Sequence, residues 1–216
     1  MSAGEPTGEP WARTLDSRST RAHGRRTLAK LLDAAVTEFA AYGWHGARMA
    51  RIAKRAGTAH GTVYVYFSDK DDLLAAVYED VGAEFRAVAE AMPPLEPGAA
   101  GFSAIREWIT GVCAALQRHG AVFQALTEAL SDEEDSRAGR AALRDQGRAL
   151  AAWADRIRAA GASGFDPMIA ALCIYALIEG SNRSVLRGEL ILSEEELVDG
   201  LSEYVHRSVF GAGADV

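Results

Sequence analysis

The stretch Arg51–Phe67, RIAKRAGTAHGTVYVYF, decides the fold of the N-terminal third of the chain. A short helical pattern runs into Ala56-Gly57, and a second short helical pattern follows, carrying Thr62, Tyr64 and Tyr66. Two short helices joined by a glycine-containing turn are typical of a helix-turn-helix, whose second helix enters the major groove while the first crosses the DNA backbone. The polar residues here are basic and aromatic, so the stretch predicts a nucleic-acid-binding surface.

The charge of the chain is divided in the same way. The 216 residues carry a formal net charge of -7, yet residues 11–70 hold 11 Lys and Arg against 4 Asp and Glu, and residues 71–216 hold 12 against 24. A basic N-terminal third on an acidic body predicts nucleic acid at one end only. The alternative is a chance excess of arginine on a solvated face.

The apolar periodicity elsewhere is helical, and no β-type alternation of useful length occurs, so the sequence predicts an all-α fold. Pro93-Pro94 and Pro97-Gly98 break the chain after a long helix that begins at the Ser68-Asp69 cap. The expected helices are 26–42 (ended by Gly43), 49–55, 59–66, 69–91, 102–118 (interrupted by Gly120), 122–130, 136–160, 167–187 (capped by Asp166) and a last one from the Ser193/Glu196 capping box to Phe210.

The cysteines and the apolar runs indicate the cellular compartment in which the protein is expected. Cys113 and Cys173 lie far apart among apolar neighbours, so we expect both thiols to be buried and the protein to be compatible with a reducing cytoplasm. The first ten residues lack the pattern of a secretory signal. The longest apolar run, Met168–Ile178, is too short to span a bilayer and indicates a buried helix. We therefore expect a cytoplasmic protein without a membrane partner.

Specific residues of the helix-turn-helix carry the expected chemistry. Gly61 allows a close backbone approach to DNA, while Thr62 and the tyrosine hydroxyls can donate to phosphates or base edges. Arg48 and Arg51 are available to phosphate. The alternative for Tyr64 and Tyr66 is half-buried aromatic packing.

The same region resembles the DNA-binding domain of the TetR family of transcriptional regulators over about residues 25–74. The matching residues are Leu31-Leu32-Asp33-Ala34-Ala35, Phe39-Ala40, Gly43, Ile52-Ala53, Ala56-Gly57, Gly61-Thr62-Val63-Tyr64, Tyr66-Phe67 and Lys70. The resemblance implies a three-helix DNA-binding domain, an all-helical effector-binding domain and a homodimer built mainly from the last two helices. We accordingly divide the chain into a flexible basic arm (1–24), the DNA-binding domain (25–74) and a ligand-binding and dimerisation domain (75–216).

Two positions depart from the family pattern. Ala47-Arg48 replaces a pair of hydroxyl residues, which removes a helix cap at a cost of about 1 kcal/mol. Ala59 replaces a serine, so we expect Thr58 to cap the recognition helix, and we expect phosphate binding to depend more on arginine, with a steeper salt dependence. The resulting candidate DNA contacts are Arg25, Arg48, Arg51, Thr58, His60, Gly61, Thr62, Tyr64, Tyr66 and Lys70.

The helix expected over 167–187 is apolar nearly all round, which predicts burial on all sides. The resemblance implies that one face lines a pocket while the other meets the partner subunit. Glu179 and Asn182 follow the apolar run, and a buried polar group needs a partner, which could be Arg183, another helix, the other subunit or a ligand. The candidate ligand-binding residues are Trp108, Val112, Phe123, Leu126, Trp153, Tyr175, Glu179 and Asn182, with simple core packing as the alternative for each. They predict a small, mostly apolar, lipophilic effector.

These observations and the resemblance predict a ligand-responsive transcriptional regulator. We expect a repressor that binds a palindromic double-stranded DNA operator as a homodimer and is released by a small, mostly apolar effector. We expect coupling through the helix over 69–91, taken as the only element shared by both domains. No cofactor, metal cluster, phosphate loop or nucleophile–base spacing is recognisable, so we expect no enzyme. The rival is a helical small-molecule-binding protein without DNA-binding activity, against which the motif and its basic charge argue.

Overall fold

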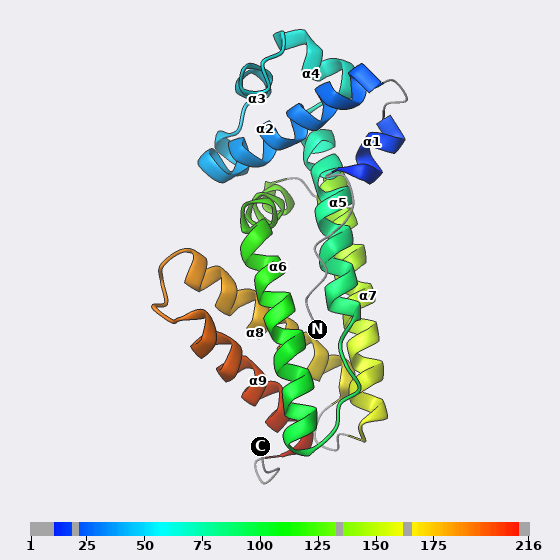
Figure 1. Cartoon of the computed structure of the whole chain (residues 1–216), viewed down its shortest axis with the longest axis vertical. Helices are drawn as coiled ribbons and strands as arrows, with labels where there is room; N and C mark the ends of the chain where they lie inside the picture. The colour runs from blue at the N-terminus through cyan, green and yellow to red at the C-terminus, as the bar shows by residue number, and fades with distance from the viewer. Residues whose placement is uncertain (1–10, 19–21, 133–135, 162–165, 212–216) are drawn as a thin grey trace. The chain divides into compact units, whose positions relative to one another are not determined.

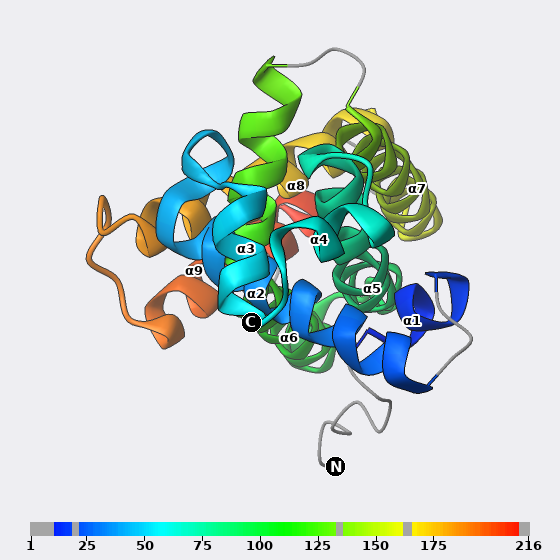
Figure 2. The same ribbon diagram turned by 90° about the horizontal axis from the view of Figure 1, so that it is seen from above.

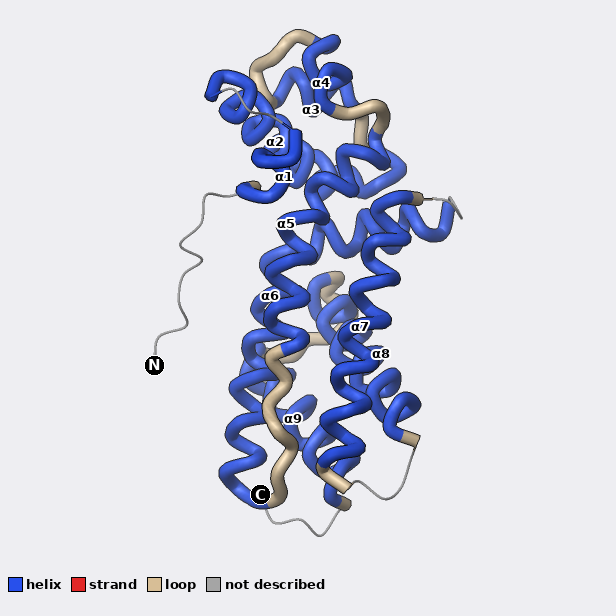
Figure 3. The backbone as a smooth tube through the Cα atoms, turned by 90° about the vertical axis from the view of Figure 1, so that its right-hand side faces the viewer, coloured by secondary structure: helices blue, strands red, loops and turns tan. Residues whose placement is uncertain are grey.

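The computed structural model describes residues 11–18, 22–132, 136–161 and 166–211 (Figure 1). Every regular element within those ranges is a helix, which confirms the all-α prediction (Figure 3). The helices are α1 (Ala12–Arg18), α2 (Ala22–Gly46), α3 (Met49–Arg55), α4 (His60–Tyr66), α5 (Lys70–Glu90), α6 (Gly98–Asp132), α7 (Arg137–Ala159), α8 (Pro167–Leu186) and α9 (Glu194–Phe210).

The chain forms two compact units, and each is built from separate stretches. The first unit contains 1–83 and 121–143, and the second contains 84–120 and 144–216. Helices α5, α6 and α7 therefore each have one end in each unit. The expectation that the helix over 69–91 is the only shared element is wrong, because α6 and α7 are shared as well.

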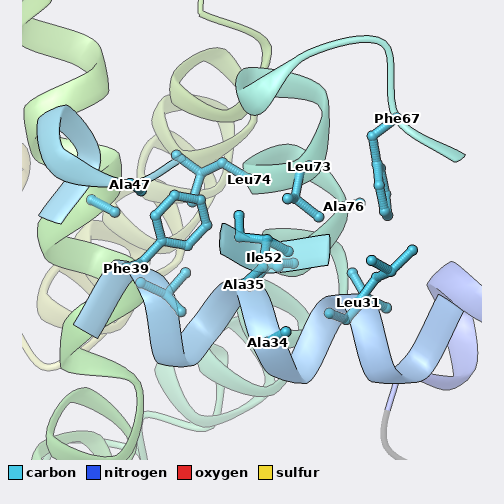
Figure 4. Close-up of a cluster of buried hydrophobic side chains, with 14 of the residues drawn as sticks. Leu31, Ala34, Ala35, Phe39, Ala47, Ile52, Phe67, Leu73, Leu74 and Ala76 are labelled. Atoms are coloured by element: carbon cyan, nitrogen blue, oxygen red, sulfur yellow. The ribbon is translucent and has the colours of Figure 1, made fainter. Parts of the chain in front are cut away.

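The core of the first unit lies between α2, α3 and the start of α5. Leu31, Ala35 and Phe39 are spaced by four residues along α2 and point to the same side, where Ile52 of α3 and Leu73 of α5 meet them (Figure 4). This apolar stripe is the one that the sequence periodicity indicated. It fixes α3, and with it the turn into α4.

Helix α1 was not expected, because residues 1–24 were assigned to a flexible arm. Leu15 is fully buried, and the hydroxyl of Thr14 donates to Ala76 O at 2.8 Å and to Asp80 Oδ2 at 2.7 Å. The backbone N–H groups of Arg13 and Thr14 also donate to Asp80. The first turn of α1 is thus capped by a carboxylate on α5, a partner too distant in sequence for the local pattern to reveal.

Gly43 breaks α2 as expected, with φ 63° and ψ -173°. Its neighbour Trp44 donates its backbone N–H to Glu128 Oε2 at 2.7 Å. A Cβ atom on Gly43 would lie 2.8 Å from the same oxygen. Only glycine fits this position, both for its backbone angles and for the carboxylate beside it.

The predicted interruption at Gly120 is wrong, because α6 runs without a break from Gly98 to Asp132. A Cβ atom on Gly120 would lie 2.8 Å from Leu186 Cδ1. The glycine therefore serves close packing against the end of α8 and does not end a helix.

The predicted caps of α8 and α9 are confirmed. The Asp166 side chain accepts from the backbone N–H groups of Met168 and Ile169, with Pro167 in the first turn. Ser193 and Glu196 form a reciprocal capping box, in which Glu196 N donates to Ser193 Oγ at 3.1 Å and Ser193 N donates to Glu196 Oε2 at 2.8 Å.

One face of α8 differs from expectation. Cys113 is buried on α6 as predicted, but Cys173 is exposed, and so are Met168, Ile169 and Leu172 beside it. In the single chain this face is exposed, and its predicted burial against the partner subunit stays a prediction. By length and composition alone α8 could cross a membrane, which for one such helix is weak evidence, because core helices of soluble proteins pass the same test.

Candidate nucleic-acid interface

The turn between α3 and α4 is built by backbone hydrogen bonds around Gly57. Gly57 has φ 69°, its N–H donates to Lys54 O at 3.1 Å, and the N–H of Thr58 donates to Ala53 O at 3.0 Å. This pair of bonds is a Schellman motif, which closes α3 and reverses the chain. It sets α4 against α3 as a helix-turn-helix (Figure 2).

Helix α4 has one buried and one exposed side. Val63 is fully buried, and Phe67 at the C-terminal cap packs into the same core. His60, Gly61 and Tyr64 are exposed, and Thr62 is half-buried. Exposed hydroxyl, imidazole and glycine positions on a short helix can reach phosphates and base edges.

Val65 is a residue that sequence reasoning missed. Its side chain is 79% exposed near the C-terminal end of α4. Gly61 stands one turn before it on the same side of the helix. An exposed apolar side chain on the second helix of such a motif suits contact with a thymine methyl group. Its exposure next to the buried Val63 was readable from the helical spacing.

The two tyrosines differ in their surroundings. Tyr64 is 50% exposed and meets only the His60 ring edge-on at 5.4 Å among the ring contacts described. Tyr66 packs against the core, and its hydroxyl donates to Gly24 O at 3.4 Å. The packing alternative therefore describes Tyr66 better than Tyr64.

Arg51 is engaged inside the domain. Its Nε donates to Glu38 Oε1 at 2.6 Å, its Nη2 donates to Gly46 O, and its guanidinium lies 4.2 Å from the centre of the Tyr42 ring. Glu38 is fully buried and also accepts from the backbone N–H of Arg48. This geometry favours a positioning role for Arg51 at the entry to α3.

The expected cap by Thr58 is absent. Ala59 is the N-cap residue of α4 and provides no side-chain hydrogen bond, while the Thr58 hydroxyl donates backward to Ala53 O at 3.2 Å. Arg48 is likewise an N-cap residue without a side-chain cap, and its side chain is exposed. Both helices of the motif therefore begin with N–H groups that no side chain at their N-cap satisfies.

The other two predicted contacts are also held by neighbours. Lys70 Nζ donates to Trp44 O at 2.5 Å and lies 4.1 Å from the Trp44 ring centre. Arg25 pairs with Asp16 at 2.5 Å. Exposed cations on the motif itself are Arg48, Lys54 and Arg55.

Helix α1 adds a brace that the sequence did not reveal. Arg18 Nη1 donates to Tyr66 O at 3.0 Å, where α4 ends, and Arg18 Nη2 pairs with Asp72 at 2.7 Å. Burial alone would raise the pKa of Asp72, but the hydrogen bonds from Arg18 and Ser68 N and the nearby arginine charges outweigh it, so this pKa lies below its usual value. Arg18 thus links the C-terminal end of α4 to α5 through one hydrogen bond and one ion pair.

The predicted ligand-binding residues fall into both units. Phe123 and Leu126 belong to the core of the first unit, where Phe123 meets the Tyr78 ring edge-on at 6.5 Å. The other predicted members lie in the second unit: Trp108, Val112, Trp153, Tyr175, Glu179 and Asn182. The eight predicted residues are therefore divided between the two units.

The aromatic members of the second unit do form one cluster. The Trp108 and Trp153 rings lie edge-on at 5.1 Å, and Tyr175 lies 6.2 Å from Trp153. The two indole N–H groups donate to Val88 O and Ala89 O, at the end of α5. Burial, with a smaller contribution from Glu179, raises the pKa of Tyr175 to about 12. No group of His, Cys, Asp and Glu within the described ranges could hold a metal ion.

Comparisons with known proteins agree with this geometry. Residues 31–77 match the model of the family described as bacterial regulatory proteins, tetR family. The fatty acid metabolism regulator protein of Bacillus subtilis is 39% identical over 61 residues, which cover 28% of this chain and 31% of that protein. The regulator BetI of Klebsiella pneumoniae is 38% identical over 72 residues, 33% of this chain and 37% of BetI. The matches thus span about a third of the length of these curated relatives.

Solved structures resemble the chain over most of its length. A TetR-like transcriptional regulator from Rhodococcus sp. RHA1 has a TM-score of 0.67 at 22% identity, covering 90% of this chain and 100% of that one. The regulator FadR from Bacillus subtilis, solved in complex with stearoyl-CoA, has a TM-score of 0.60 at 23% identity, covering 85% and 98%. At these identities the likeness establishes the fold.

Proposed function

Because its DNA-binding domain makes this chain a member of the TetR family of bacterial regulatory proteins, we propose that it is a transcriptional repressor released from its operator by a lipophilic effector. The observation that carries the proposal is the outward side of α4. His60, Gly61, Tyr64 and Val65 are exposed there, on a helix held by a buried core. Such a helix can enter the major groove without losing its own packing.

The exposed face of α8 supports a homodimer. Met168, Ile169 and Leu172 form an apolar strip on this helix, and Tyr204 of α9 is exposed as well. Large exposed apolar side chains gathered on one element are typical of protein interfaces. A second copy would cover them in a two-fold arrangement of α8 and α9, and would present two recognition helices to a palindromic operator.

The relatives support a lipophilic effector. Trp108, Trp153 and Tyr175 form an uncharged aromatic cluster in the second unit. One relative is a fatty acid metabolism regulator by name, and the similar regulator FadR was solved in complex with stearoyl-CoA. Effector binding would favour a dimer whose recognition helices no longer match successive major grooves, about 34–36 Å apart. The alternative function, a helical ligand-binding protein without DNA-binding activity, does not account for the residues exposed on α4. A DNA partner would support a cytoplasmic location for the protein.

Gel-shift experiments test the proposal. Two sources of duplex DNA would be used: the region upstream of the protein's own gene, and a pool selected from random sequence. We expect a sequence-specific shift that weakens with salt, and Arg48→Ala should reduce the salt slope by about one. Absence of any specific shift from both sources would overturn the proposed function.

Matched variants separate contact from folding. Tyr64→Ala should weaken operator binding by about 1–3 kcal/mol with little change in melting temperature. Leu143 on α7 is 53% exposed, close to the exposure of Tyr64, so Leu143→Ala is the control and should leave binding unchanged. If Tyr64→Ala unfolds the domain, its ring is packing and not a contact.

A further inference from the structure

Asn182 of α8 is a buried amide whose orientation is fixed by its neighbours. Its side chain is 2% exposed, and Nδ2 donates to Ile178 O at 2.9 Å and to Cys113 Sγ at 3.3 Å. Exchanging the amide oxygen and nitrogen would set Oδ1 against the Ile178 carbonyl, acceptor against acceptor. The amide nitrogen must therefore face Ile178 and Cys113.

This orientation leaves Oδ1 without a hydrogen-bond donor. The oxygen is buried and has no partner in the described parts of the chain. Buried amide oxygens in proteins nearly always accept a hydrogen bond, so a buried acceptor without a donor marks a place that a group from outside the chain can satisfy. A bound water is the simplest such group, and a ligand is the functional one.

The surroundings of Asn182 favour an uncharged ligand. Tyr175 lies two turns earlier on the same side of α8, beside the Trp153 ring. Burial raises the pKa of the Cys113 thiol, with Asn182 opposing and Glu194 adding to the rise, so the thiol stays neutral. The nearby ions, Glu179 and Arg183, pair with each other at 2.9 Å.

An anion is disfavoured here for two reasons. A carboxylate would set its oxygens against Asn182 Oδ1, which can only accept a hydrogen bond. Glu179 opposes negative charge at Tyr175, where Arg183 offsets part of its effect, and Glu194 opposes negative charge at Cys113. A buried cation would lack a carboxylate partner, because Glu179 is already paired.

We propose that Asn182 Oδ1 accepts a hydrogen bond from an uncharged donor on the effector, such as a hydroxyl or amide N–H joined to an apolar tail. The apolar part would pack beside the half-buried Tyr175 ring, two turns earlier on α8, because the chain itself already buries the Trp108 and Trp153 rings. The effector is thus a neutral lipid-like alcohol or amide, and not a free fatty acid in its ionised form. This inference rests on the effector response in the proposed function.

Thermal unfolding with a matched series of alkyl compounds tests it without DNA. The probes are decanamide, 1-decanol, decanoate, methyl decanoate and decylammonium, with their octyl and dodecyl counterparts. We expect the amide and the alcohol to raise the melting temperature of the full chain, and decanoate and the methyl ester not to. Asn182→Leu should weaken decanamide binding roughly tenfold. The adjacent Ser181→Ala should bind decanamide as the parent protein does.

Each contrary outcome is distinct. Equal stabilisation by decanoate and decanamide, or an unchanged decanamide affinity in Asn182→Leu, overturns the proposed hydrogen bond. Stronger stabilisation by decylammonium overturns the uncharged assignment, and no response to any probe means that water satisfies Oδ1. A thermal response without DNA binding would refute the regulator instead, so the two failures can be told apart.

Discussion

Gly43→Ala should destabilise the first unit through two separate effects whose sizes follow from the structure. The backbone angles, φ 63° and ψ -173°, lie in a region that is almost exclusive to glycine, and placing alanine there costs about 2 kcal/mol. The new Cβ atom would stand 2.8 Å from Glu128 Oε2 and displace the carboxylate that accepts from Trp44 N. Since Glu128 is partly exposed, we assign about 1 kcal/mol to that loss.

The total of about 3 kcal/mol should lower the melting temperature by roughly 6–12 °C for a chain of this size. Urea unfolding followed by circular dichroism measures the free energy directly. Two glycines serve as controls because no atom lies within 4 Å of a Cβ placed on either of them. Gly57→Ala, at φ 69°, should cost about 1–2 kcal/mol from strain alone, and Gly61→Ala, inside α4, should stabilise by up to about 1 kcal/mol.

A double-mutant cycle separates the two effects of Gly43→Ala. In a Glu128→Ala background the alanine at position 43 has no carboxylate to displace, so its cost should fall by about 1 kcal/mol. A loss below about 0.5 kcal/mol for Gly43→Ala in the parent protein would refute the strain argument. An unchanged loss in the Glu128→Ala background would refute the contact argument.

Further expectations concern charge, DNA reading and assembly. Burial alone would raise the pKa of Glu128, but hydrogen bonds from Gln124 and Trp44 N and the charge of His45 lower it below 4.5. The stabilisation that ionised Glu128 contributes is therefore fully present above pH 4.5 and is lost as the pH falls through the depressed pKa. Acid titration of unfolding should accordingly show a shallower loss below pH 4.5 in Glu128→Gln than in the parent, and equal slopes would contradict this. Val65→Ser should weaken binding by about 1–3 kcal/mol to an operator that carries thymine at the contacted position, as measured by gel shift. The same substitution should not weaken binding to an operator in which uracil replaces that thymine, because uracil lacks the methyl group. Leu172→Glu should convert the dimer to a monomer in light scattering, whereas Leu143→Glu should not; a dimer in both variants would place the interface elsewhere.

Local patterns predicted most of the helices, because their information lies within a few residues. The Asp166 cap and the Ser193 capping box were readable in this way, as was the apolar stripe of α2. Gly120 misled because a glycine chosen for close packing and a glycine that ends a helix look alike in sequence. Only the position of Leu186 distinguishes them.

The candidate interface was predicted in place but not in detail. Tyr64 is exposed as its spacing indicated, yet Arg51, Tyr66 and Lys70 are held by partners that the local pattern did not reveal. Helix α1 was missed for the same reason, because Asp80 caps it from α5. The sequence shows which side chains have the chemistry to bind DNA. Only the fold shows which of them already form hydrogen bonds or ion pairs within the protein.

The composition of the first unit has a consequence for protein synthesis. Asp71 accepts from the backbone N–H of Arg137 at 2.8 Å and from the Ser136 hydroxyl at 2.7 Å, and Glu128 accepts from Trp44 N. These partners are translated dozens of codons after the helix-turn-helix itself. A nascent chain that has emerged only to Pro94 would lack the Glu128 acceptor for Trp44 N and the donors that Asp71 binds, so the connection from α2 to α3 and the start of α5 would be less well held. Premature termination or proteolysis there should give a fragment with poor DNA affinity.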